Sequence, residues 1–330
     1  MRAFAVALFA SVCATACLPV DDRPPPGILT VTLTSDDSLG PERKPFDTDD
    51  GWTVSFDSFV MSVGYTRLGL SDACSDYAGS LFGPGRGYNR LIQLNAAEEQ
   101  RVSAVRLIGT CSLQFWNREP EDDSVLGEGV TEKLRDRLRK KKDDPFTKDL
   151  GTTLYVKGHA VRGEKRKTFT WSFRQAIRHR SCQVTTESGV ERGVQLESDE
   201  TREYDLHVLG KLLFLASPSS TELAFEPFAS ADDEYGNADG RVTLTELRKT
   251  PLSEELSAWA TTWLEDFSRA LEEAPRGVEV FTPKADDIKT YAGYVYLGLV
   301  PELVRFRRTG TCRVDQALDK TMERVLRSQD

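Results

Sequence analysis

Oxygen-bearing side chains are spaced as in a cation site at one place in this sequence, between Phe228 and Leu247. A calcium ion takes about six to eight oxygen ligands, which a 12-residue helix-loop-helix loop supplies at fixed positions. The pattern is D-x-[DN]-x-[DN]-G-x5-E, in which glycine allows the sharp turn at the sixth position. With Gly240 sixth, ligands fall at Asn237 (third), Asp239 (fifth), Arg241 (seventh, through its carbonyl), Thr243 (ninth) and Glu246 (twelfth). The spacing therefore predicts a calcium-binding loop.

The first half of the loop departs from this pattern. The first position falls on Tyr235, which has no carboxylate. Asp233 supplies the first ligand if the loop carries two extra residues, and Asp232 does so if it carries three. Pro227 restricts the incoming helix, because proline fits the first helical turn but not the interior, and Pro251 limits the outgoing one. We predict a variant loop between short helices, with Asp233 taken as the first ligand.

Residues 228–247 resemble the EF-hand family, and the resemblance covers these roughly 20 residues only. It implies the ligand roles given above for Asn237, Asp239, Arg241, Thr243 and Glu246. Calcium would be structural here, because a lone hand lacks the partner that sensor proteins use, and weakly bound, at ~10⁻⁴–10⁻³ M. The alternative is an acidic surface turn in which Asn237–Gly240 supply only turn chemistry.

The N-terminal residues 1–16 predict export. One positive charge, an apolar run too short to span a membrane and small residues before a cysteine are typical of a secretory signal. Ala14-Thr15-Ala16-Cys17 resembles the lipobox of bacterial lipoproteins, which implies cleavage before Cys17 and diacylation of that cysteine. An ordinary secretory signal cleaved after Ala16 is the alternative.

The residues after the signal predict a surface anchor. Residues 17–27 are proline-rich and polar, as in a semi-rigid tether, and a lipid on Cys17 would hold the chain on a membrane without spanning it. Leu18, rather than aspartate, after the lipidated cysteine favours the outer membrane by resemblance to enterobacterial sorting. We therefore expect a bacterial cell-envelope protein whose partners are the membrane and an envelope protein or polysaccharide. A net charge of -9 and a pI near 5.1 argue against nucleic acid.

Four cysteines remain beyond Cys17: Cys74, Cys111, Cys182 and Cys312. In an oxidising compartment this number suggests two disulfides, with three pairings to choose from. We favour Cys74–Cys111, on proximity in sequence, together with Cys182–Cys312.

Residues 28–215 carry the signature of a β-rich domain. Alternating runs occur at 28–34, 51–70, 101–116, 152–177 and 202–214, separated by turn residues. The 51–70 run is long for one strand, and its apolar phase slips near Asp57–Phe59, which indicates a bulge. Gly163–Arg166 should join two strands as a hairpin, with Phe169, Trp171 and Phe173 on one face. An antiparallel β-sandwich or open barrel is expected.

Residues 216–330 are predicted to be a helical region that contains the calcium-like loop, so the fold class is α+β. Ser253 should cap an amphipathic helix, and a second helical segment ends at Pro301. Within the β-rich domain, Thr131 should cap one helix with a basic end. Basic residues there, at Arg162–Lys167 and at Arg178–Arg180, could form an anionic-lipid or polysaccharide patch, but solvated charges explain them better.

No catalytic residue is assigned. Histidines occur at 159, 179 and 207 without a helical HExxH pair, and the G-x-S-x-G elbow of one hydrolase class is missing. The favoured function is a non-enzymatic binding or structural protein of the envelope. The alternative is a carbohydrate-binding module or glycoside-active enzyme on a calcium-steadied sandwich, which would place Trp52, Trp116 or Trp171 in a cleft with two carboxylates across it.

Overall fold

A computed structural model describes residues 24–69, 74–76, 89–142, 150–272 and 285–317. The lipobox at Ala14–Cys17 and most of the predicted tether lie outside the described residues. Among the helices within these ranges, none combines the length and apolar character needed to cross a bilayer.

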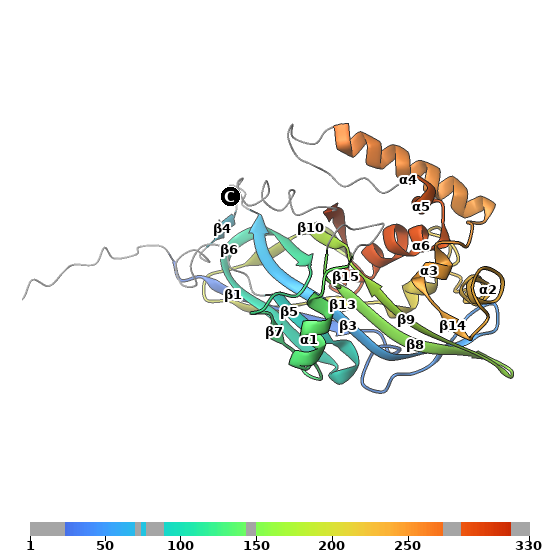
Figure 1. Cartoon of the computed structure of the whole chain (residues 1–330). Coiled ribbons are helices and arrows are strands. Elements are labelled where there is room, and N and C mark those ends of the chain that lie inside the picture. Colours follow the sequence, from blue (N-terminus) through green and yellow to red (C-terminus); the bar gives the residue numbers. More distant parts are fainter. Residues whose placement is uncertain (1–23, 70–73, 77–88, 143–149, 273–284, 318–330) are drawn as a thin grey trace, which may run out of the picture.

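Strands supply most of the regular structure in the described ranges, as Figure 1 shows. They are β1 (Gly27–Ser35), β2 (Phe46–Asp47), β3 (Thr53–Gly69), β4 (Cys74–Asp76), β5 (Asn89–Gln93), β6 (Glu99–Asn117), β7 (Val125–Leu126), β8 (Leu154–Arg162), β9 (Lys165–Phe173), β10 (Ala176–Thr186), β11 (Gly189–Arg192), β12 (Val194–Leu196), β13 (Thr201–Val208), β14 (Arg241–Val242), β15 (Val304–Phe306) and β16 (Thr311–Ala317).

The helices gather toward the C-terminal part of the chain, apart from the short α1 (Figure 1). They are α1 (Glu132–Arg139), α2 (Glu226–Tyr235), α3 (Leu244–Leu247), α4 (Glu254–Glu272), α5 (Ala285–Ile288) and α6 (Tyr291–Gly293), followed by a π-helical segment (Tyr294–Leu299) and a 3-10 turn (Val300–Glu302). The predicted combination of a β-rich part and a C-terminal helical region is confirmed.

The 19-residue strand β6 lies in the middle of the sheet and pairs with several other strands. Its first half pairs with β1, and its last residues pair with β3 and β10. Between them lies Gly109, whose φ of 88° is open to glycine but strained for other residues. Gly109 itself pairs with β4 and β12, so the ladder continues along β6 while its partners change from β1 to β3 and β10. The sheet therefore curls into a half-barrel rather than closing as two separate layers.

The prediction of a purely antiparallel sheet is wrong. The order β14-β9-β8-β3-β6-β1-β13-β15 includes two parallel pairs, β14 with β9 and β1 with β13. Both parallel partners are distant in sequence, so a long connection replaces the hairpin turn that an antiparallel pair uses. Alternation along one strand does not reveal the direction of its neighbour, and for this reason the sequence pattern missed the mixed topology.

Two local predictions in the strands are confirmed. The register between β3 and β8 shifts between Phe56 and Ser58, so Asp57 is the extra residue of the expected bulge. The β8–β9 hairpin turns through Gly163, whose φ of 59° suits a two-residue turn. The bulge and the turn together fix which side chains of β9 face the core.

The predicted strand at 202–214 is too long. β13 ends at Val208, and Gly210–Phe214 forms a 3-10 turn. Leu213 and Phe214 are adjacent, and both are buried. A strand would place them on opposite faces, so the tighter turn buries both side chains.

One hydrophobic cluster draws on both predicted regions. Phe214 lies at its centre and contacts an aromatic ring from β3, two from β9 and two from around the start of α2, namely Phe56, Phe169, Trp171, Phe225 and Phe228. Buried side chains on both sides of the expected boundary at 215/216 therefore share a core. The boundary itself stays a prediction.

The predicted helix caps are confirmed. The side chain of Thr131 accepts a hydrogen bond from the backbone N–H of Leu134 and begins α1. Leu138 of α1 packs with Val60 and Leu91 over a second, smaller cluster. The Ser253 side chain accepts from the backbone N–H of Leu256 at the start of α4.

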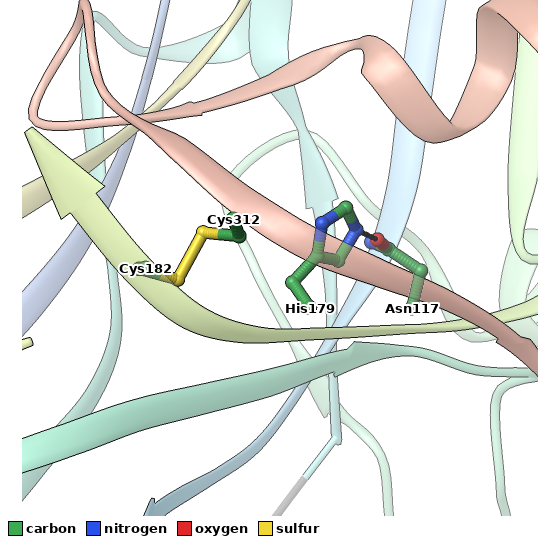
Figure 2. The surroundings of a disulfide bond; sticks show 4 residues. All are labelled: Asn117, His179, Cys182 and Cys312. Carbon is green, nitrogen blue, oxygen red and sulfur yellow. Dashed lines mark hydrogen bonds between the residues drawn. A yellow bond between two sulfur atoms is a disulfide. The ribbon is translucent and has the colours of Figure 1, made fainter.

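The Cys182–Cys312 disulfide is confirmed and joins β10 to its neighbour β16 (Figure 2). On the same strand, His179 donates from Nε2 to Oδ1 of Asn117 at 2.9 Å and stacks on Phe115. Cys111 is also disulfide-bonded. The side chain of Cys74 lies outside the described side chains, so the pairing Cys74–Cys111 stays a prediction.

Candidate cation site

The calcium-like loop begins at a helix that the sheet holds by its N-terminus. Pro227 lies in the first turn of α2, as predicted. The carboxylate of Asp50, in the turn between β2 and β3, accepts from the backbone N–H groups of Phe225 and Glu226 at 2.7 and 2.6 Å. An anion at this helix end compensates its partial positive charge. Asp50 therefore stabilises the helix that carries the loop.

Asp232, on the last turns of α2, is at the first position of the loop if three extra residues are counted, and it organises the turn that follows. Its Oδ1 accepts from the backbone N–H of Asp239 at 3.1 Å, and its Oδ2 from that of Gly240 at 2.9 Å. Its backbone carbonyl accepts from Ala238 at 3.0 Å. The side chain is completely buried. The chain folds back around this one carboxylate, an arrangement that fits three extra residues in the loop, and the choice of Asp233 as the first ligand stays a prediction.

The ammonium of Lys167, on β9, lies between Asp232 and Asp233. Nζ donates to Oδ2 of Asp232 at 2.6 Å and to Oδ1 of Asp233 at 2.5 Å. The lysine side chain is 7% exposed, whereas that of Asp233 is 43% exposed. Burial alone would lower the pKa of Lys167, but its hydrogen bonds to Asp232 and Asp233 raise that pKa above the ordinary value. Lys167 is therefore held as a cation.

The later candidate ligands bond within the loop. Oδ1 of Asp239 accepts from the backbone N–H of Arg241 at 2.9 Å, and its Oδ2 accepts from Nδ2 of Asn237 at 3.2 Å. Thr243 and Glu246 form a capping box at the start of α3: Oε2 of Glu246 accepts from the Thr243 backbone N–H at 2.8 Å, and the Thr243 hydroxyl accepts from the Glu246 backbone N–H at 3.2 Å. Each carboxylate thus has a local structural partner.

These residues fit the backbone frame of the predicted loop better than they fit a calcium ion. Gly240 has the positive φ, 78°, that the sixth position requires. Within the described ranges, however, no three side chains of His, Cys, Asp or Glu converge to hold a metal. The first-position carboxylate already accepts two backbone N–H groups and an ammonium. Calcium would have to displace Lys167 from Asp232, so in this arrangement the donor set does not fit the ion.

The loop is joined to the sheet through β9. Residues Arg241–Val242 pair in parallel with Thr168 and Phe169, and the backbone N–H of Thr168 donates to the Gly240 carbonyl at 2.8 Å. The indole Nε1 of Trp171 donates to the Val242 carbonyl at 3.0 Å. Figure 1 shows α2, α3 and β14 gathered beside β8 and β9. The strand β9 therefore holds the loop against the sheet, between β14 and β8.

Lys167 belongs to the basic run Arg162–Lys167, which was predicted to be solvated, so its role in this loop was not expected. Alternation along β9 contains the signal, because Lys167 has the same parity as Phe169, Trp171 and Phe173, all of which are buried. A lysine on the core face of a strand must meet a carboxylate, since an unpaired buried charge is costly. The acidic residues of α2 are the partners that satisfy this requirement.

Two of the three tryptophans that could have formed a sugar-binding platform, Trp52 and Trp171, are buried in the core. Trp52 and Trp171 are 1% and 0% exposed, and Nε1 of Trp52 donates to Oε2 of Glu226 at 2.8 Å. Trp116 is half-buried, with the guanidinium of Arg178 5.5 Å from its ring centroid. Trp52 and Trp171 therefore cannot stack on an external sugar ring.

The three histidines lie on different strands and have separate partners. His159 on β8 lies 3.3 Å from a carboxylate oxygen of Asp57, and Nδ1 of His207 on β13 is 2.9 Å from the Thr34 hydroxyl. Burial lowers the pKa of His207, against the opposing effect of Asp205. With His179 bonded to Asn117, the histidines are distributed as structural side chains.

Comparisons with protein-family models, with curated proteins and with solved structures find no match to this chain.

Proposed function

We propose that this chain is an exported bacterial envelope protein, anchored by a lipid on Cys17, that acts as a non-enzymatic binding or structural protein. The observation that carries the proposal is the run Ala14-Thr15-Ala16-Cys17 behind a short apolar segment. The proline-rich residues that follow would hold the β-rich body away from the membrane surface. A single acyl signal binds a membrane only marginally, but a diacylated cysteine gives a stable anchor.

Two structural observations support export to an oxidising compartment and a structural or binding role. The Cys182–Cys312 disulfide joins neighbouring strands, and disulfides persist mainly outside the cytosol. Acidic residues that could have served a reaction instead cap helices and compensate a buried lysine, as Asp50, Glu246 and Asp232 do. The burial of Trp52 and Trp171 gives the carbohydrate-binding alternative less support than the structural one.

The experiment that tests the anchor is fractionation of bacterial cells that express the full-length chain or Cys17→Ala. We expect the wild-type protein in the membrane fraction, labelled by radioactive palmitate. Cys17→Ala should lose the label and leave that fraction, because the acyl chains supply the membrane affinity. Cys13→Ala is the matched control and should behave as the wild type. A Cys17→Ala protein that keeps its label, or a mature chain that begins elsewhere, contradicts the proposal.

A further inference from the structure

The loop between α2 and α3 presents a contradiction: its backbone follows an EF-hand frame, yet its first carboxylate is bound to a lysine. Asp232 organises the turn through three backbone N–H groups, those of Ala238, Asp239 and Gly240. In a calcium-binding hand the first carboxylate needs a cation as well, because a buried carboxylate with no positive partner is strongly disfavoured. Asp232 is completely buried, and the cation within reach is the Lys167 ammonium at 2.6 Å.

Lys167 is distant from the loop in sequence, but its strand β9 pairs with β14, which is part of the loop. Lys167 precedes Thr168, whose backbone N–H donates to the Gly240 carbonyl, and Phe169, which pairs with Val242. The register between β14 and β9 therefore places the Lys167 ammonium next to the carboxylates of α2. Asp233 accepts from the same ammonium at 2.5 Å, so two acidic side chains share one positive charge.

We infer that the Lys167 ammonium replaces calcium as the cation of this loop. The loop therefore folds without a metal ion. The lysine compensates the negative charge of Asp232 and links the loop to β9. The remaining carboxylates are then free for the turn and cap that Asp239 and Glu246 make. This inference is independent of the lipid anchor, because it concerns only the folded body.

The test compares thermal unfolding of the full-length chain, purified in detergent, in chelator and in about 10 mM calcium chloride. For the wild type we expect a Tm that differs by less than about 1 °C between the two conditions, because an ion that does not bind the folded form cannot stabilise it. Lys167→Met keeps the apolar stem but removes the charge. In chelator it should lower the Tm by roughly 5–15 °C, because Asp232 is left buried without a cation.

Calcium should then stabilise the variant. For a site with Kd of ~10⁻⁴–10⁻³ M, mass action at this concentration raises the Tm of Lys167→Met by roughly 3–8 °C. Lys165→Met is the matched control: it lies two residues earlier on β9 with an exposed side chain, and it should match the wild type in both conditions. Lys167→Gln, which can still donate to one carboxylate, carries the same test if Lys167→Met does not fold.

Two results would overturn the inference. One is a calcium-induced rise in the wild-type Tm that Glu246→Ala abolishes, because calcium would then bind the loop in spite of Lys167. The other is a Lys167 variant that folds but shows no calcium response, because the ammonium would then be an ordinary ion pair. Neither outcome bears on the membrane fractionation of Cys17→Ala.

Discussion

Trp171→Ala should lower the free energy of unfolding by about 3–5 kcal/mol, the cost of removing a large buried aromatic side chain. The Trp171 ring is completely buried. It stacks on Phe169 of its own strand at 4.5 Å and on Phe228 of α2 at 5.3 Å between ring centroids. Its Nε1 also donates to the Val242 carbonyl, which the substitution would leave buried without that donor. Urea unfolding followed by circular dichroism measures the effect as a lower midpoint with an unchanged slope.

Trp171→Phe separates packing from hydrogen bonding. Phenylalanine keeps most of the apolar contact but cannot donate to Val242, so the loss should be about 1–3 kcal/mol, as for a buried acceptor that loses its partner. Val190→Ala is the control, because that side chain is 54% exposed on β11 and its removal should change stability by less than about 0.5 kcal/mol. Equal stability of Trp171→Ala and the wild type would show that the helical region does not depend on packing against β9.

Local features of this fold are predictable because they depend on a few neighbouring residues. Thr131 and Ser253 cap helices through a hydroxyl that reaches a backbone N–H three residues later, a relationship visible in sequence. The bulge at Asp57 follows from a slip in apolar phase within one strand. The pairing of β1 with β13, however, joins residues more than a hundred positions apart, and nothing in the alternation of either strand specifies that partner or its direction.

The candidate site also combines features that nearby residues determine with features that depend on distant parts of the chain. The turn at Gly240 follows from short spacings and was predictable. The T-x-x-E spacing of Thr243 and Glu246 also signals their capping box, but both residues were predicted as calcium ligands and the cap was missed. The identity of the first loop residue was not predictable, because it depends on how far α2 continues before the chain turns back. The partner of Asp232 was not predictable either, since Lys167 reaches it only through the pairing of β14 with β9. A motif of oxygen ligands does not reveal a lysine supplied from another strand.

Removal of the Cys182–Cys312 disulfide should lower the free energy of unfolding by about 2–5 kcal/mol. The two cysteines are 130 residues apart, and the entropy of closing a loop of that length in the unfolded chain sets a ceiling of roughly 5 kcal/mol. Cys182 is completely buried, so the double variant Cys182→Ala/Cys312→Ala is preferable to serine, which would bury a hydroxyl. Urea unfolding without reductant measures the loss.

The double variant separates the effect of this bond from that of the bond at Cys111, which a reductant would also break. Since β10 and β16 pair through backbone hydrogen bonds on both sides of the disulfide, the folded variant should keep the wild-type circular dichroism spectrum. The lower stability then comes from the unfolded state, whose conformational entropy rises once residues 182 and 312 are no longer joined. A variant as stable as the wild type would contradict this. It would mean that strain in the folded protein or residual structure in the unfolded chain cancels the entropy of loop closure. A variant with an altered spectrum would show instead that the bond holds β16 in place.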